Sequence, residues 1–139
     1  MTQNTDQSSM IAPRFREMST FLRTPYVEDL SSIDIGLVGV PFDGAVTNRA
    51  GARHGPRQIR DMSSMMRTTH HVSKINPYNV CRVGDVGDVP LTNIYDLSEV
   101  NDQIASFFKL LVKNKVFPIS VGGDHSITYP ICRAVAEED

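Results

Sequence analysis

The chain has almost no cysteine: Cys81 and Cys132 are the only two among its 139 residues. They match neither the paired spacing of a zinc finger nor the dense disulfide framework of a small secreted domain. This scarcity is typical of a reducing compartment, so we expect a cytoplasmic protein.

An excess of charge and a long apolar run are missing as well. The chain has 14 Lys and Arg residues against 16 Asp and Glu, a formal net charge of -2, which creates no field that attracts nucleic acid or an anionic membrane. No apolar stretch reaches the roughly 20 residues that span a bilayer, and the polar residues 1–13 do not resemble a signal peptide. We therefore expect neither a nucleic-acid partner nor a membrane partner.

What is present suits one globular domain, because 40% of the residues are hydrophobic and 22% are charged. Residues 1–12 are rich in Gln, Asn, Thr and Ser without periodicity and predict a disordered tail. Residues 15–29 predict an irregular arm that lies either on the domain itself or on another subunit. Residues 13–139 are expected to belong to a single domain.

Three short apolar runs predict buried strands at residues 33–40, 80–83 and 116–121. The glycine-rich residues 84–88 predict a loop after the second strand. Helical segments separate the three strands, so the connections should be right-handed crossovers between parallel strands. The predicted fold class is α/β, with helices on both faces of a parallel sheet.

Two helices are predicted between these strands. Residues 56–67 begin with a proline in the first turn, and residues 97 to about 113 follow Asp96 and Glu99, which have the spacing of a helix-capping pair. In the first helix we expect an apolar stripe to pack against the core. It comprises Ile59, Met62, Ser63 and Met66, with Met65 beside it.

Ligands bind beyond the carboxyl ends of the strands in such sheets, which marks residues 41–55 and 122–126 as candidates. In the second segment, two glycines let the chain turn sharply before Asp124 and His125. A neutral imidazole is a good ligand for a divalent metal, and a nearby carboxylate can orient it. The residues alone leave other roles open: His125 could pack in the core, and Asp124 could only cap a helix.

Residues 121–130, which read Val-Gly-Gly-Asp-His-Ser-Ile-Thr-Tyr-Pro, resemble the first metal-binding signature of the ureohydrolase family, the arginases and agmatinases. Residues 39–43 and 48–60 resemble the N-terminal loop of the family in its agmatinase branch. The two signatures occur in the order that the family has, and the similarity extends from about residue 13 to the end of the chain.

The resemblance implies a three-layer α/β/α domain with two manganese ions bridged by a hydroxide, and nickel or another divalent metal remains an alternative. In the family, the hydroxide attacks a guanidinium carbon, and urea and an amine are released. By position, His125 corresponds to a direct metal ligand, and Asp124 to a residue that supports it without binding metal. The resemblance also implies a homo-oligomer, either a trimer or a hexamer.

The other metal ligands of the family lie in an Asp-Ala-His-x-Asp segment and a later Asp-x-Asp segment, and this sequence contains neither. Family members are about twice as long, so we interpret the chain as the N-terminal part of a ureohydrolase domain that is inactive alone. Asp85 and Asp88 are expected to be structural, because aspartates flanked by glycines usually serve turns. No catalytic residue is assigned within the chain.

Asn48 is the candidate substrate contact in residues 41–55, because it is neutral and the substrate is a cation. The basic residues nearby have open roles, but we expect them to make hydrogen bonds and ion pairs within the protein rather than to contact a guanidinium group. They are Arg49, Arg53, His54, Arg57 and Arg60.

The expected function is hydrolysis of a linear guanidino compound, with agmatine as the preferred substrate and 4-guanidinobutanoate or 3-guanidinopropanoate as the alternative. A non-catalytic subunit-binding module is the alternative of another class. A hydrolase that uses His125 as a base oriented by Asp124 is disfavoured, because adjacent side chains at a strand end seldom point together and no nucleophile elbow occurs.

Overall fold

The computed structural model describes residues 13–16 and 18–138, so the predicted tail over residues 1–12 lies outside the described residues. The sheet has three parallel strands in the order β2-β1-β3: β1 is Ile35–Val40, β2 is Val83–Asp88 and β3 is Phe117–Gly122. The predicted fold class, α/β with a parallel sheet, is therefore confirmed.

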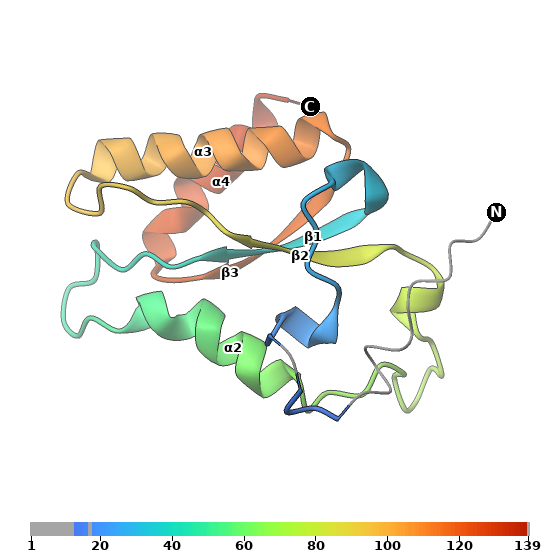
Figure 1. Ribbon diagram of the computed structural model, residues 1–139. Helices are drawn as coiled ribbons and strands as arrows, with labels where there is room; N and C mark the ends of the chain where they lie inside the picture. Colours follow the sequence, from blue (N-terminus) through green and yellow to red (C-terminus); the bar gives the residue numbers. More distant parts are fainter. Residues whose placement is uncertain (1–12, 17, 139) are drawn as a thin grey trace.

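Helices cover both faces of this sheet (Figure 1). α3 (Leu97–Lys113) and α4 (Thr128–Ala136) lie on one face. α2 (Gly55–Ser63) and the short 3-10 helix η1 (Phe21–Arg23) lie on the other. The main core fills the space between the sheet and the α3 side, where Val38, Ile104 and Phe108 are completely buried. No helix among the described residues is long and apolar enough to cross a membrane.

β3 accommodates Pro118 because of the direction in which its backbone groups point. Phe117 donates its backbone N–H to the carbonyl oxygen of Asp34 at 2.8 Å, on the side of β1. Pro118 is the next residue along the strand, so its backbone nitrogen points the other way, toward the edge of this sheet. Proline therefore removes no hydrogen bond between β3 and β1.

The second strand differs from its prediction. The residues that pair with β1 are Val83–Asp88 rather than 80–83, so the glycine-rich segment expected to be a loop is itself the strand. Gly84 lets the side chain of Val27 approach the backbone of β2 closely, because a Cβ at position 84 would lie 2.7 Å from that side chain. Asp85 can be buried in a strand because its carboxylate has charged and backbone hydrogen-bond partners.

α3 begins as the capping pair predicts. The Asp96 carboxylate accepts hydrogen bonds from the backbone N–H groups of Ser98 and Glu99, at 2.9 and 3.1 Å. The helix ends at Lys113, and two further bonds close its carboxyl end: Lys115 N–H donates to the Val112 carbonyl and Val116 N–H to the Leu111 carbonyl. This pair of bonds is a Schellman motif, with Lys115 in the left-handed conformation at φ 60°.

The apolar stripe predicted for the first helix does not pack against the core. α2 is shorter than predicted, and the side chains of Ile59, Met62 and Met66 are 44%, 61% and 61% exposed. Met65 is exposed as well. The helix turns Arg60 and Ser63 inward instead, because the surface beneath it presents polar groups: the Asp85 carboxylate and the backbone N–H of Leu22.

The arm predicted for residues 15–29 lies largely on its own domain. Phe21 is 2% exposed, and the Arg60 guanidinium carbon lies 4.0 Å from the centre of its ring. Val27 N–H donates to the Asp85 carbonyl at 2.9 Å, and Asp85 N–H donates to the Pro25 carbonyl at 2.9 Å. Phe15 remains 93% exposed.

Candidate functional site

The two segments marked at the carboxyl ends of the strands meet in the structure. β1 and β3 are paired, with Val40 opposite Gly122, so the residues that follow them leave the same edge of the sheet. Asp124 N–H donates to the carbonyl of Phe42 at 2.8 Å, and Ala45 N–H donates to the Asp124 carboxylate at 2.9 Å. Residues 41–55 and 122–126 therefore form one surface.

Two glycines make this approach possible. Gly123 has φ 70°, and a Cβ there would lie 2.5 Å from the carbonyl oxygens of both Val40 and Phe42. A Cβ at Gly55, the first residue of α2, would lie 2.5 Å from the carbonyl oxygen of Gly122. Only glycine fits either position without displacement of the backbone.

Asp124 supports the loop rather than the imidazole next to it. Its carboxylate accepts hydrogen bonds from Ala45 N–H and Ser126 N–H, each at 2.9 Å, and from the Ser126 hydroxyl group. These bonds fix the conformation in which residue 125 is presented. The bonds of the Asp124 side chain go to Ala45 and Ser126, and the predicted support of His125 as a metal ligand stays a prediction.

His125 is the first residue of the 3-10 helix η5 (His125–Ile127), and its side chain is exposed at the carboxyl edge of the sheet. Ile127, two residues later, is 7% exposed and anchors the turn in the core. The Nδ1 atom of His125 lies 3.3 Å from the hydroxyl oxygen of Thr128. Thr128 is thus a neighbour of the ring that the sequence pattern did not single out.

Within the part of the chain that the structure describes, no group of three or more His, Cys, Asp or Glu side chains is placed to hold a metal ion. An exposed imidazole on a fixed turn suits one ligand of a divalent metal, but a metal ion needs several ligands of suitable geometry. The described residues therefore fit a single ligand position and do not form a complete metal site.

Asp43 holds residues 41–55 in place. The residue is 2% exposed, and its carboxylate accepts hydrogen bonds from the backbone N–H groups of Gly51 and Arg53, at 2.6 and 3.2 Å, and from the Arg53 guanidinium group. The Arg53 guanidinium beside it lowers the pKa of Asp43 from 3.8 to about 2. The expected role of Arg53, an ion pair within the protein, is confirmed.

Asn48 lies on the same loop between Ala45 and Gly51, and its side chain is exposed without a hydrogen bond to any described residue. Arg49 and His54 are exposed too. The structure brings these residues to the edge of the sheet that also carries His125. Their contact with a substrate stays a prediction.

Asp85 and Asp88 belong to β2 and contact α2 through Arg60. The Arg60 guanidinium donates to both oxygens of Asp85, at 2.8 and 3.0 Å, and to Asp88 at 2.6 Å. The Asp85 carboxylate also accepts the N–H groups of Phe21 and Gly87, each at 2.9 Å. The prediction that both aspartates are structural is confirmed.

The fold and this surface define an α/β protein with a histidine-bearing glycine loop at the carboxyl edge of a parallel sheet. The family model described as "Arginase family" matches residues 33–139. The chain therefore belongs to the arginase family.

Curated relatives extend this result. The chain is 50% identical over 126 residues to guanidinopropionase from Pseudomonas aeruginosa, a match that covers 91% of this chain and 39% of that protein. It is 38% identical over 135 residues to mitochondrial agmatinase from Gallus gallus, with 97% of this chain and 39% of that protein covered. The chain thus spans about 39% of the length of these relatives.

Solved structures share the fold. The structure of proclavaminate amidino hydrolase from Streptomyces clavuligerus superposes with a TM-score of 0.84 at 32% identity, over 91% of this chain and 43% of that one. A formiminoglutamase variant from Trypanosoma cruzi, determined with Mn2+, has a TM-score of 0.71 at 24% identity, over 86% of this chain and 40% of that one.

Proposed function

We propose that the protein that carries this chain hydrolyses a linear guanidino compound to urea and an amine. The observation that supports this most directly is the junction of residues 41–55 with residues 122–126, which presents His125 at the carboxyl edge of the sheet in a member of the arginase family. Water adds to the guanidinium carbon, the bond from that carbon to the substituted nitrogen breaks, and the departing amine takes up a proton.

The role proposed for His125 is that of a metal ligand. Its side chain is exposed, and its backbone is fixed by the bonds of Asp124 to Ala45 and Ser126. Two manganese ions, when bound, would polarise the guanidinium group and supply an activated water. The remaining ligands would come from residues outside this chain, because the described residues contribute no cluster of ligands.

The metal is testable on the protein at its full length. Purified protein should contain about two manganese ions per subunit by elemental analysis, because the family site takes two divalent ions. A His125→Ala variant should retain less metal, and Thr128→Val, which removes only the neighbouring hydroxyl group, serves as the matched variant. Full metal content in His125→Ala would exclude His125 as a ligand. A different dominant ion, such as nickel, would show that the proposed metal, manganese, is wrong.

The substrate is the finer part of the proposal. Agmatine was the substrate expected from the sequence, and the 38% identity to an agmatinase supports it. The 50% identity to a guanidinopropionase favours a guanidino acid such as 3-guanidinopropanoate. Arg49, which is exposed beside Asn48 on the same loop, supplies a cation that suits a carboxylate at the far end of such a substrate.

A direct comparison of substrates separates these candidates. Urea release by the full-length protein would be measured with agmatine, 3-guanidinopropanoate and 4-guanidinobutanoate, and kcat/KM compared. A guanidino-acid enzyme with Arg49 at its carboxylate should lose activity toward the acid in Arg49→Gln, chiefly through KM, with activity toward agmatine retained. Preference for agmatine in the unmodified protein would overturn the guanidino-acid assignment. Absence of urea with all three compounds would overturn the function itself.

We also propose that the protein forms a homo-oligomer. Apolar side chains remain exposed on β3, where Phe117 and Ile119 are 67% and 43% exposed, and on α2. Either another part of the full-length chain or a second subunit could cover them. The mass of the full-length protein in solution distinguishes a monomer from a trimer or a hexamer.

A further inference from the structure

Four apolar side chains project together from α2 and from the turn that follows it. They are Ile59, Met62, Met65 and Met66, and all four are exposed. The turn keeps the helical spacing, because Met65 N–H donates to the Met62 carbonyl at 3.2 Å. Positions three and four apart are neighbours on a helix surface, so these side chains form one continuous surface, which we call the methionine face.

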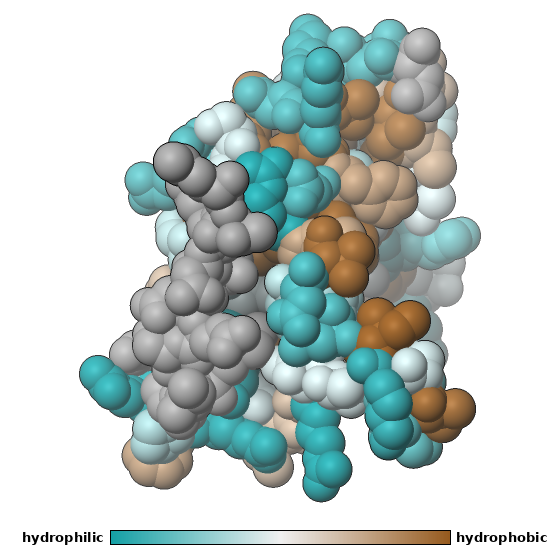
Figure 2. All heavy atoms as spheres, turned by 90° about the vertical axis from the view of Figure 1, so that its right-hand side faces the viewer, coloured by the Kyte–Doolittle hydropathy of each residue, from teal (hydrophilic) through white to brown (hydrophobic). Residues whose placement is uncertain are grey.

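A continuous apolar surface of this kind indicates a contact with another protein surface. Elsewhere the exposed apolar side chains are more scattered. On the side of the molecule where the strands begin, hydrophobic side chains form separate small groups among hydrophilic ones (Figure 2). The methionine side chain is flexible and adapts to irregular surfaces, which suits it to such a contact.

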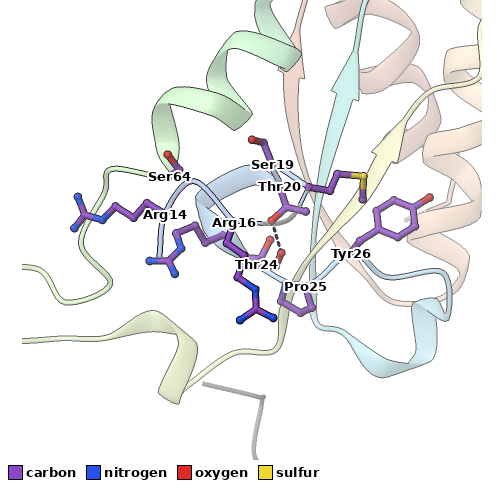
Figure 3. Close-up of a pocket in the computed structure, with 10 residues that line it drawn as sticks. Arg14, Arg16, Ser19, Thr20, Thr24, Pro25, Tyr26 and Ser64 are labelled. Carbon is purple, nitrogen blue, oxygen red and sulfur yellow. Dashed lines mark hydrogen bonds between the residues drawn. The ribbon is translucent and has the colours of Figure 1, made fainter. Parts of the chain in front are cut away.

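The methionine face is held in its outward position. Arg60 and Ser63 point inward from α2, where each makes a hydrogen bond with the surface beneath. At the carboxyl end of the helix, Ser64 and residues of the N-terminal arm line one pocket (Figure 3). The arm is tied to the helix there, because the Ser19 hydroxyl donates to the Asp61 carboxylate at 2.9 Å. The helix cannot turn its apolar side inward without losing these bonds, so the face is preorganised for a partner.

Positive charge borders the methionine face. Residues 55–75 contain four Lys and Arg residues and a single acidic residue, Asp61. Arg60 pairs with the carboxylates beneath the helix, whereas Arg57, Arg67 and Lys74 are exposed. A surface that binds this face should therefore carry negative charge.

The outer surface of α3 has that charge. A shallow groove along its first half is lined by Asp96, Glu99 and Asp102, which we call the acidic face. All three are exposed, and Asp102 keeps 70% of its side chain exposed although it pairs with Arg133. Both lysines of α3 form ion pairs with the glutamates that follow α4, so they do not oppose this charge. Leu110, exposed two helical turns beyond Asp102, adds an apolar contact on the same side of α3.

We propose that the methionine face of one subunit binds the acidic face of a second copy of this chain. α2 and α3 lie on opposite faces of the sheet (Figure 1), so the two surfaces of one chain point away from each other. Between two copies, the basic residues around the methionines oppose the carboxylates of α3, and the methionines pack near Leu110. This inference rests on the proposed homo-oligomer and names its contact surfaces.

The contact joins two different surfaces, so it is heterologous, and such contacts form a ring when the rotation between subunits closes. A trimer is a closed ring of this kind. A symmetric contact between two copies of α2 is disfavoured, because it would bring the exposed arginines of both copies together.

Reversal of charge on each surface tests the proposal in the full-length protein, with the mass measured by sedimentation. One variant carries Met62→Glu with Arg67→Glu, and the other carries Asp102→Lys with Ser106→Lys, all at exposed positions. Each variant alone should associate roughly a hundredfold more weakly, about tenfold for each substitution. An equimolar mixture of the two should regain the parent mass, because each supplies the surface that the other lacks. Glu28→Lys, an exposed charge reversal outside both surfaces, is the control and should leave the mass unchanged.

The outcomes separate this contact from the proposals on which it rests. An unchanged mass in both variants would overturn the contact and leave the homo-oligomer standing, whereas a monomeric parent would overturn both. Dissociation of the variants without recovery in the mixture would overturn the pairing of these two surfaces. Circular dichroism shows whether each variant is folded, and recovery in the mixture requires that both are. Urea release, measured on the same samples, reports on the proposed hydrolysis independently of the mass.

Discussion

The carboxylate of Asp124 accepts a hydrogen bond from the backbone N–H of Ala45 at 2.9 Å, across 79 positions of the sequence. This bond joins the loop after β1 to the loop after β3. Because the same carboxylate also accepts the N–H and hydroxyl of Ser126, both of its oxygens are occupied. The two loops of the candidate site are therefore held together by a carboxylate whose oxygens both bind other groups of the protein.

Replacement of Asp124 by Asn should destabilise the chain by roughly 1–3 kcal/mol. An amide has a single acceptor oxygen, so its NH2 group would face the N–H of either Ala45 or Ser126. Thermal unfolding measures the loss. Asp102→Asn is the control, because that exposed carboxylate pairs with Arg133 and such a pair contributes about 1 kcal/mol or less. Equal effects of the two variants would contradict a special role for Asp124.

The ion pair of Asp43 with Arg53 should make stability depend on acid pH. The pKa of Asp43 is lowered from 3.8 to about 2 in the folded protein. The unfolded chain therefore binds a proton first as the pH falls, and the contribution of this carboxylate is complete above about pH 4 and lost toward pH 2. Unfolding midpoints of the parent and Asp43→Asn should differ at pH 6 and converge near pH 2. A difference that does not change with pH would refute this.

Gly55→Ala should destabilise the protein by about 1–3 kcal/mol, the usual cost of overpacking. The new Cβ would lie 2.5 Å from the Gly122 carbonyl oxygen and would push the start of α2 away from β3. The expected change in stability is opposite to the usual one, because alanine in place of a helical glycine ordinarily stabilises by about 1 kcal/mol. A higher unfolding temperature for Gly55→Ala would show that the two segments are not in close contact.

Lys115→Gly should stabilise the protein by about 0.5–1 kcal/mol, because glycine adopts the left-handed conformation of the Schellman position without strain. Lys115 has φ 60° there. The paired control is Lys113→Gly, two residues earlier in the last turn of α3, which should lose about 1 kcal/mol. The two unfolding temperatures should shift in opposite directions. Shifts of the same sign would contradict the left-handed conformation of Lys115 at the carboxyl end of α3.

The isolated chain should release no urea from guanidino compounds. His125 is a single potential ligand, and the described residues place no further ligands around it. One imidazole does not hold two divalent ions. Urea formation by the purified chain with added manganese, compared with His125→Ala, measures this. Activity above that variant would refute the prediction and would require ligands that the fold does not supply.

Much of the architecture followed from local patterns. The apolar run that became β1 and the Asp96 cap of α3 were predicted within a few residues, because burial on two faces and capping are properties of neighbouring residues. The second strand was misplaced because Gly84 and Asp85 are turn residues by composition. Pairing with β1 and contacts with Arg60 and with the arm, all remote in sequence, make a strand favourable there.

The prediction that the apolar side of α2 packs against the core was also wrong. Helical spacing correctly identified an amphipathic helix but assigned the apolar side to the interior. The surface beneath α2 carries the Asp85 carboxylate, which pairs with Arg60, and the backbone N–H of Leu22, which donates to the Ser63 hydroxyl, so polar side chains must face it. That surface is built from segments distant in sequence, so no local pattern contains it.

The sequence by itself determined the family, the parallel α/β fold and the presence of His125 on a glycine loop after the third strand. The family, the fold and this loop depend on residue types and on short spacings along the chain, which are the same whether or not the chain is folded. Tertiary structure decided that Asp124 binds Ala45 and Ser126 rather than the imidazole, and that Arg60 pairs with Asp85 and Asp88. Hydrogen bonds and charge clusters require distances between remote residues, and only the folded backbone fixes those distances.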